Sequence, residues 1–326
     1  MNTTRLSLLA ITAAVAGTML CTGALAQAYP TKPIRIVVPF PPGGGTDTIA
    51  RETSQKVATA TGWTFVIDNK PGAGGNLGVD AVAKSPADGY TIVIGQTSNL
   101  AINPTLYAKM PYDSQKDLAP IVLLANAPLV MVTGIGTPLK TLGDAVGAAR
   151  AKPGTMNFAS PGNGTVAHLT SVMFQKAAGI QTQHIPYKGA AQALTDVISG
   201  TVELYMSSVP TLIGQIRNNK LRPLAVTSAK RVDDLPNVPT INESGYTGFD
   251  AVTWFGLLAP AGTPKDVITR LNAEFNKALQ NADLRKALGD QGADAAGGTP
   301  EQFAAVIRDD IPRWGKVVKD SGAKVD

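Results

Sequence analysis

Short apolar runs alternate with amphipathic segments along most of the chain. Ile34–Val38, Trp63–Ile67 and Tyr90–Gly95 are apolar runs of the length typical of buried strands. Between them, Thr48–Thr61 and Leu77–Ser85 place apolar residues at helical spacing. Strands that alternate with helices predict a parallel α/β sheet, in which ligands bind at the carboxyl ends of the strands.

The centre of the chain carries a longer β-like stretch. Leu118–Gly134 is mostly apolar and is interrupted by Asn126 and Pro128, so we expect it to cross into a second domain. Asp250–Ala259 is a similar stretch and is expected to cross back. The remaining predicted elements are strands at 156–160, 183–187, 202–206 and 224–227, and helices at 139–151, 166–178, 190–199, 210–219, 264–280, 282–289 and 300–319.

A glycine turn follows the first predicted strand. It begins with Pro41 and Pro42, continues through Gly43–Gly45, and leads into a helix for which Thr46 and Asp47 are suitable N-caps. A helix N-terminus leaves backbone N–H groups free and adds the positive end of the helix dipole. The turn is therefore suited to a small anion such as a carboxylate.

A second unit of the same kind follows about 119 residues later. Pro161–Thr165 is a glycine turn between a strand and a helix, and Gly179 and Lys188 match Gly62 and Lys70 in position. The nearly constant offset predicts two lobes built on one plan, although common strand–turn–helix turns could also coincide by chance. Lobes that face each other would bring both turns to one cleft that closes like a hinge.

This reasoning predicts an α/β fold with two lobes, each a parallel or mixed sheet flanked by helices, and a ligand cleft between them. The predicted organisation is a signal peptide at 1–26, a first lobe at 27–125 plus 251–326, and a second lobe at 126–250. Two lobes also agree with the 300 residues that remain after the signal peptide.

The first 26 residues have the features of a secretory signal. Arg5 is followed by a mostly apolar run and by Ala24–Ala26, an A-x-A cleavage pattern. A membrane anchor is the alternative, but the apolar run is short. Cys21, the only cysteine, lies in this segment, so the mature protein is expected to be periplasmic and free of disulfides.

Charge and composition exclude several classes of function. Removing Arg5 from the 29 basic residues leaves 28 against 24 acidic ones, and no basic run is interleaved with aromatic residues, so nucleic acid is not an expected partner. His168 and His184 do not have zinc-ligand spacing, and no nucleophile elbow or phosphate loop is present. We therefore predict no metal, no cofactor and no catalytic residue. Gly162–Ala167 fits a loose dinucleotide pattern, but the acidic residue expected about 20 positions later is missing.

The predicted ligand-binding residues are polar or glycine residues at strand ends, together with possible pocket walls. Neutral N–H and hydroxyl donors can hold a carboxylate without a fixed cation, since each charge-assisted hydrogen bond contributes ~1.5–3 kcal/mol. The residues are Phe40, Gly44, Gly45, Thr46, Asp47, Gln96, Thr97, Ser98, Ser160, Gly162, Asn163, Gly164, Thr165, His168, Tyr187, Lys188, Ser207, Ser208 and Trp254. For some of them a structural role is the alternative: a cap for Asp47, helix packing for His168, and core packing for Phe40 and Trp254.

Several segments together resemble a known family. They are Tyr29–Arg35, Val38–Asp47, Asn69–Gly75, Ser85–Thr91, Ser160–Thr165 with His168, Pro186–Gly189, Leu235–Gly245 and Ala259–Pro264. The chain is similar over nearly all of its mature length to the Bug/TctC-type family, the extracytoplasmic solute receptors of tripartite tricarboxylate transporters.

The resemblance implies a periplasmic binding protein-like II fold and capture of a small carboxylated solute by the two glycine turns. It also implies delivery to a two-component membrane permease by a protein that we expect to be a monomer. Ser207 and Ser208 depart from the Asp or Asn that many members carry there, which favours a dicarboxylate, tricarboxylate or aromatic acid over an amino acid. A sensor for a signalling partner and a periplasmic enzyme are the alternative functions.

Overall fold

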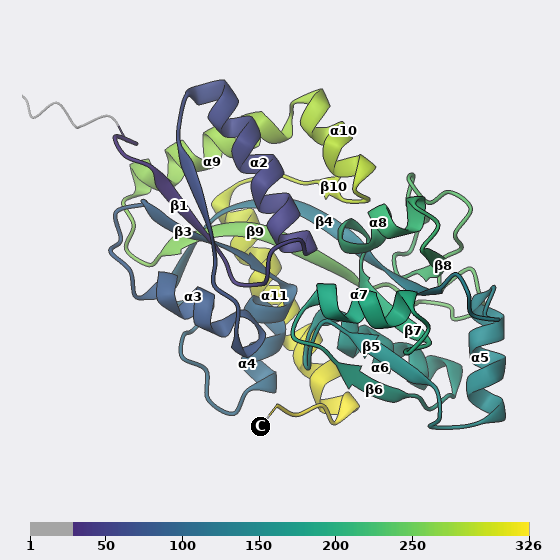
Figure 1. The fold of residues 1–326 in the computed structure, drawn as a ribbon. Helices are drawn as coiled ribbons and strands as arrows, with labels where there is room; N and C mark the ends of the chain where they lie inside the picture. The colour runs from purple at the N-terminus through teal and green to yellow at the C-terminus, as the bar shows by residue number, and fades with distance from the viewer. Residues whose placement is uncertain (1–28, 326) are drawn as a thin grey trace, which may run out of the picture. The chain divides into compact units, whose positions relative to one another are not determined.

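The computed structural model describes residues 29–325, and the predicted signal peptide lies outside the described residues. From Pro33 onward the chain forms a mixed sheet with strand order β2-β1-β3-β9-β4-β7-β5-β6, in which β8 and β10 also pair with β4 (Figure 1). The strands are β1 Ile34–Val38, β2 Phe65–Asn69, β3 Thr91–Gln96, β4 Leu118–Gly134, β5 Asn157–Ser160, β6 Gln183–Pro186, β7 Leu204–Ser208, β8 Leu221–Val226, β9 Val252–Pro260 and β10 Asp294–Ala295.

Strand β4 connects two halves of this sheet. Its residues from Leu118 to Pro128 pair antiparallel with β9, and those from Leu129 to Gly134 pair antiparallel with β7 and β8. We call β1, β2, β3, β9 and β10 with their helices the first half, and β5 to β8 with theirs the second half. The predicted crossing segments are therefore the two long central strands. The lobe boundaries at 125/126 and 250/251 stay a prediction.

Both halves begin with the same parallel arrangement. In the first half β1 pairs parallel with β2 and β3, and in the second half β5 pairs parallel with β6 and β7. The connecting helices α2 and α6 both end at a glycine in the left-handed conformation, Gly62 with φ 75° and Gly179 with φ 60°. The carboxyl ends of β1 and β5 each lead into a glycine turn and then a helix, as the sequence predicts.

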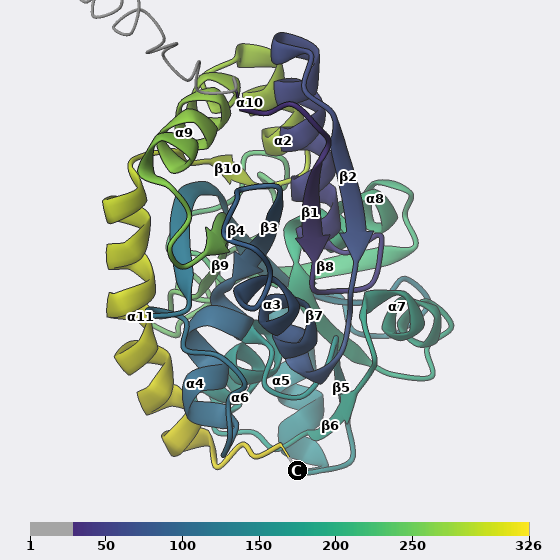
Figure 2. The same ribbon diagram turned by 90° about the vertical axis from the view of Figure 1, so that its left-hand side faces the viewer.

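Helices cover both halves (Figures 1 and 2). They are α2 Gly45–Thr61, α3 Asn76–Ala83, α4 Asn103–Leu106, α5 Leu142–Ala151, α6 Val166–Ala178, α7 Ala190–Ile198, α8 Val209–Arg217, α9 Lys265–Leu279, α10 Ala282–Asp290 and α11 Pro300–Ser321, with a 3₁₀ turn η1 at Ala73–Gly75 and a π-helical turn η2 at Ser98–Ile102. Helix α11 packs on η2, α4 and β4 and also on α6, so it contacts both halves (Figure 2). Its buried Phe303 and Trp314 belong to the core.

Two local predictions that bear on the site differ from the structure. Helix α2 starts at Gly45 rather than Thr48, and its N-cap is Gly44, which makes no side-chain capping bond. Thr46 and Asp47 are therefore within the first turn and are not its caps. Ser207 and Ser208 lie inside β7 instead of after it, because they pair in register with Val130 and Leu129 of β4.

Candidate functional site

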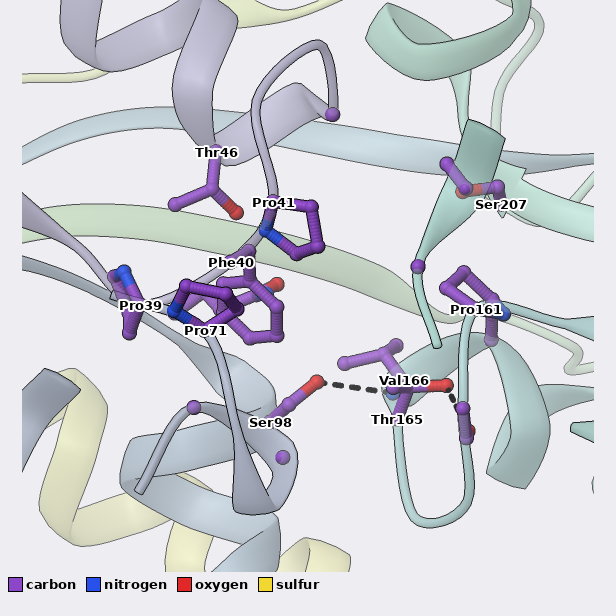
Figure 3. Close-up of a pocket in the computed structure, with 18 of the residues that line it drawn as sticks. Pro39, Phe40, Pro41, Thr46, Pro71, Ser98, Pro161, Thr165, Val166 and Ser207 are labelled. Carbon is purple, nitrogen blue, oxygen red and sulfur yellow. Dashed lines mark hydrogen bonds between the residues drawn. The ribbon is translucent and has the colours of Figure 1, made fainter. Parts of the chain in front are cut away.

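A cavity of about 590 Å³ is lined by residues of both halves. Figure 3 shows Thr46 and Ser98 of the first half facing Ser207 and Thr165 of the second half across it, with Phe40 on the side of the first half beside Pro41 and Pro71. Both glycine turns contribute to this one cavity. The predicted residues that line it are Phe40, Gly44, Gly45, Thr46, Gln96, Ser98, Gly162, Asn163, Thr165, Tyr187, Lys188, Ser207 and Ser208.

Four helices begin at the wall of this cavity. Its lining includes Gly45 at the start of α2, Val166 at the start of α6, Ala190 at the start of α7, and Ser208, the N-cap of α8. Each start adds partial positive charge and unsatisfied N–H groups. Their convergence makes the cavity favourable for a negatively charged group.

The first glycine turn is stabilised from behind by Asp47. Its carboxylate accepts from the Gly43 N–H at 3.0 Å, from Arg51 at 2.9 Å and from the Asn69 side-chain amide at 3.0 Å. Burial opposes ionisation of this carboxyl group, but the bonds from Arg51, Gly43 and Asn69 outweigh burial and lower its pKa. Asp47 does not line the cavity, so the geometry favours its structural role.

The second glycine turn is stabilised by histidines. The Gly164 N–H donates to His168 Nδ1 at 3.1 Å, and the His168 ring stacks on His184 with 3.8 Å between centroids. Burial lowers the pKa of His168 to about 3, with a further contribution from His184, and burial lowers that of His184 to about 4. His184 Nε2 lies 2.7 Å from Ser160 Oγ. His168, Ser160 and Gly164 thus lie behind the cavity lining.

Two hydrogen bonds join the halves beside the cavity. The Gly45 N–H donates to Thr211 Oγ1 at 3.0 Å, and the Val166 N–H donates to Ser98 Oγ at 3.1 Å (Figure 3, Ser98 to Val166). In each case a hydroxyl group of one half caps a helix of the other half. These two N–H groups are therefore already satisfied, and other donors of the turns remain for a ligand.

Two further predicted residues lie in the core. Trp254 is 3 % exposed, donates from Nε1 to Asp310 at 2.6 Å, and packs edge-on against Phe303. Thr97 is fully buried, and its hydroxyl accepts from the Trp254 N–H at 3.0 Å. Neither side chain lines the cavity, so the alternative of core packing fits Trp254.

Some lining residues were not predicted. Thr211 lies three residues after Ser208 in the first turn of α8, a spacing that could have suggested it. Gly189 has φ 119° and follows the Lys188 turn, which was a further signal. Local sequence patterns contain no signal for Tyr107, Phe255 or Val325, since these reach the cavity only through tertiary packing.

The chemistry of the lining is neutral apart from one lysine. Within the described residues, the exposed Lys188 is the only charged side chain on the cavity wall, and no Asp or Glu lines it.

No group of three potential metal-ligating side chains is present among residues 29–325. In that same range no helix combines the length and hydrophobicity needed to span a membrane.

Comparisons with known proteins agree with this architecture. The family model described as "Tripartite tricarboxylate transporter family receptor" matches residues 49–323. BugT of Bordetella pertussis is 39% identical over the full length of both chains. The R. palustris protein Rpa4515, solved with adipate, has a TM-score of 0.88 and 35% identity over 91% of this chain and 100% of that one. MatC of Rhodopseudomonas palustris, solved with bound malate, has a TM-score of 0.83 and 30% identity over 89% and 100%.

These likenesses confirm the predicted fold class, a two-lobed periplasmic binding protein fold, and the resemblance on which the sequence analysis relied. The family model is that of a transporter receptor, and the relative that matches over its full length is a Bug protein. The chain belongs to the tripartite tricarboxylate transporter receptor family.

Proposed function

We propose that this protein captures a small carboxylate in the periplasm and delivers it to a two-component membrane permease. The observation that carries the proposal is the convergence of four helix N-termini, from both halves, on one cavity. Each free N–H or hydroxyl donor that reaches a carboxylate contributes ~1.5–3 kcal/mol, so a few of them suffice for micromolar affinity, which is about 8 kcal/mol.

The residues of the cavity wall favour an acid without an amino group as the ligand. No Asp or Glu among the described lining residues could pair with an ammonium group, whereas Ser207, Ser208 and Thr46 offer hydroxyl groups. Phe40, Phe255 and Leu129 add apolar walls. We therefore infer a dicarboxylate, a tricarboxylate or an aromatic acid as the ligand class. The solved neighbours with adipate and malate are consistent with this class.

We further propose that the two lobes, 27–125 with 251–326 and 126–250, close around the ligand by bending in β4 and β9. Strand β4 runs through both halves, and the chain returns to the first half at the start of β9. A ligand that bonds to both glycine turns would favour the closed form by its contacts with both halves. A smaller radius of gyration in solution scattering with ligand than without it would support this motion.

Calorimetry with matched acids and amides tests the ligand class. We expect one or more of adipate, malate, citrate and benzoate to bind with micromolar affinity, and adipamide and benzamide to bind at least 30-fold more weakly, because they lack the charge that strengthens each hydrogen bond. The recovered acid should be unchanged. Equal affinity for acids and amides, or conversion of the acid, would contradict a carboxylate receptor.

A charge placed on the cavity wall tests the site itself. Ser207→Asp puts a carboxylate beside the proposed anion, and we expect it to weaken binding of the best acid at least 30-fold through like-charge repulsion. Ser207→Asn is the matched control of similar size, and we expect its affinity to stay within about fivefold of the parent protein. Unchanged affinity of the aspartate variant would place the ligand elsewhere.

A further inference from the structure

The turn at Pro161–Thr165 is connected to a buried pair of histidines behind the cavity. Gly162, Asn163 and Thr165 of this turn line the cavity, while His168 and His184 do not. His168 lies in the first turn of α6. His184 lies in β6, where it pairs with Phe158 of β5. The two rings are nearly parallel, with 7° between their planes and 3.8 Å between centroids.

Hydrogen bonds connect each ring to a different end of the turn. His168 Nδ1 accepts from the Gly164 N–H at 3.1 Å. His184 Nε2 contacts Ser160 Oγ at 2.7 Å, and that hydroxyl group also lies 3.0 Å from the Gly162 carbonyl oxygen and 3.3 Å from the Gly162 N–H. A hydroxyl group has one donor and two acceptor positions. All three contacts are satisfied when Ser160 donates to the Gly162 carbonyl and accepts from the Gly162 N–H and from His184 Nε2–H.

This arrangement requires a neutral His168 ring and a proton on His184 Nε2. His168 must leave Nδ1 without a proton in order to accept from Gly164, and His184 must carry its proton on Nε2. The surroundings favour neutral rings, because α6 has no charged residue before Lys176 and His168 lies in its first turn, near the positive end of the helix dipole. Beyond β6, Tyr187 donates to Asp196 and Lys188 is exposed, and no described residue forms an ion pair with either ring.

We propose that His168 and His184 are positioning residues for ligand binding, which hold the Gly162–Gly164 backbone in the conformation that the ligand meets. This inference rests on the proposed carboxylate-binding function. It extends the site to His184, a residue that neither touches the cavity nor belongs to the predicted set. The ring pair acts on the ligand only through Ser160 and the glycine backbone.

Conservative and non-conservative variants separate positioning from simple packing. Asn can replace His Nδ1 with an amide oxygen that accepts from Gly164, and Gln can replace His Nε2 with an amide N–H that donates to Ser160. We expect His168→Leu and His184→Leu to weaken binding of the best acid about tenfold or more, whereas His168→Asn and His184→Gln stay within about threefold. If the leucine variants bind as the parent protein does, or if Asn and Gln fail to rescue, the proposal is overturned.

Nuclear magnetic resonance of the intact protein and of its His168 variants gives a readout that needs no ligand. We expect both rings to show the neutral Nε2–H tautomer at pH 7, and the Gly164 amide proton to shift in His168→Leu and return in His168→Asn. The Gly43 amide, which donates to Asp47, is the internal control and should not move. An Nδ1–H tautomer of His168 would overturn the proposal. If no acid binds to the parent protein, the proposed function fails, and these spectra still decide whether the rings position the turn.

Discussion

The two glycine turns perform the same structural task with different chemistry. In the first turn the Gly43 N–H donates to Asp47, and in the second the Gly164 N–H donates to His168, in each case to a side chain four residues later. Asp47 is an ionised carboxylate that also bonds to the half-exposed Arg51. His168 is a neutral ring enclosed against His184. One backbone geometry can therefore be stabilised by a charge or by a neutral acceptor.

The difference follows from the surroundings of each turn. Gly43 and Gly44 have space around them, since a Cβ on Gly43 would meet nothing within 4 Å and one on Gly44 only the Pro41 carbonyl oxygen at 3.8 Å. A Cβ on Gly164 would lie 1.8 Å from Leu106 Cδ2 of the first half. The first turn can use a carboxylate paired with Arg51 near the surface, whereas the second is enclosed between the halves, where an unpaired charge would be costly.

The largest expected difference in stability between the two turns comes from adding one methyl group to each of them. Gly164 has φ +69°, so Gly164→Ala combines backbone strain with a clash against the buried Leu106. We expect it to lower the free energy of unfolding by about 2–4 kcal/mol. Gly44 has φ −85°, and Gly44→Ala should cost less than about 1 kcal/mol. Urea unfolding of both variants measures the difference.

Equal losses in the free energy of unfolding of the two alanine variants would contradict this difference, because they would show that the second turn is as open as the first. The double variant Gly164→Ala with Leu106→Ala separates the clash with Leu106 from the backbone strain. Removing the Leu106 side chain relieves the clash but leaves the strain at φ +69°, so the two substitutions should be less costly together than their separate effects add up to.

Acid should destabilise the second turn before the first. The histidine pKa values are about 3 and 4 in the fold and near 6.5 when unfolded, so the unfolded chain binds more protons below pH 6.5. Stability is therefore complete above pH 6.5 and decreases as the pH falls toward 4. A fully buried histidine contributes about 1.4 kcal/mol per pH unit, and since His184 is partly exposed we expect ~1–2 kcal/mol per unit for the pair.

The first turn responds in a different pH range. The pKa of Asp47 is lowered in the fold from 3.8, so its contribution is present above pH 3.8 and is lost only below it. Unfolding curves between pH 7 and 4 should thus depend on the histidines alone among these supports. The double variant His168→Asn with His184→Gln should flatten the slope, and an unchanged slope would assign the acid sensitivity to other groups.

The sequence alone predicted the strand–turn–helix units well and their capping poorly. The bounds of β1, β4 and α6 agree with the structure because each segment is mostly apolar or amphipathic and a glycine or proline stands at or next to one of its ends. Thr46 was predicted to cap α2, but Thr211 of the other half accepts from its first N–H. The π-helical turn at Ser98–Ile102 was missed for a similar reason, since packing against α11 rather than local sequence stabilises it.

The same distinction applies to the candidate site. Most of the predicted glycine, serine and threonine residues at strand ends line the cavity, because the carboxyl edge of a parallel sheet is readable from the order of elements, but Ser160, Gly164 and Thr97 do not. Asp47 and His168 were placed near it but behind the turns. Which face of the first helical turn meets the ligand depends on the partner half, and a local pattern does not contain that information.

Removing the support of the first turn should have an intermediate effect. Asp47→Ala leaves the Gly43 N–H without its acceptor and leaves the Asn69 side-chain amide with only the Phe40 carbonyl oxygen, and we expect a loss of about 2 kcal/mol in the free energy of unfolding at pH 7. Asp47→Asn keeps one acceptor oxygen and should cost about half as much. Equal losses from the two variants would mean that charge rather than hydrogen bonding supports the turn, because both lack the charge and only asparagine keeps an acceptor.

The smallest expected effects concern the two hydroxyl groups that cap helices across the halves. Thr211→Val removes the acceptor of the Gly45 N–H, and Ser98→Ala removes that of the Val166 N–H. Each change should cost about 1 kcal/mol, as expected for one neutral hydrogen bond or one lost N-cap. Thr211→Ser is the matched control, because it keeps the hydroxyl group and should restore most of the loss.

These two variants also test whether the halves are coupled equally on both sides of the cavity. Ser98 and Thr211 lie on opposite halves, and each bonds to the helix that follows the other half's glycine turn. If closure requires both bonds, hydrogen exchange at the Gly45 and Val166 amides should become faster in either single variant. If each variant affects only its own amide, the two turns are held independently, and the similarity between them ends at the backbone.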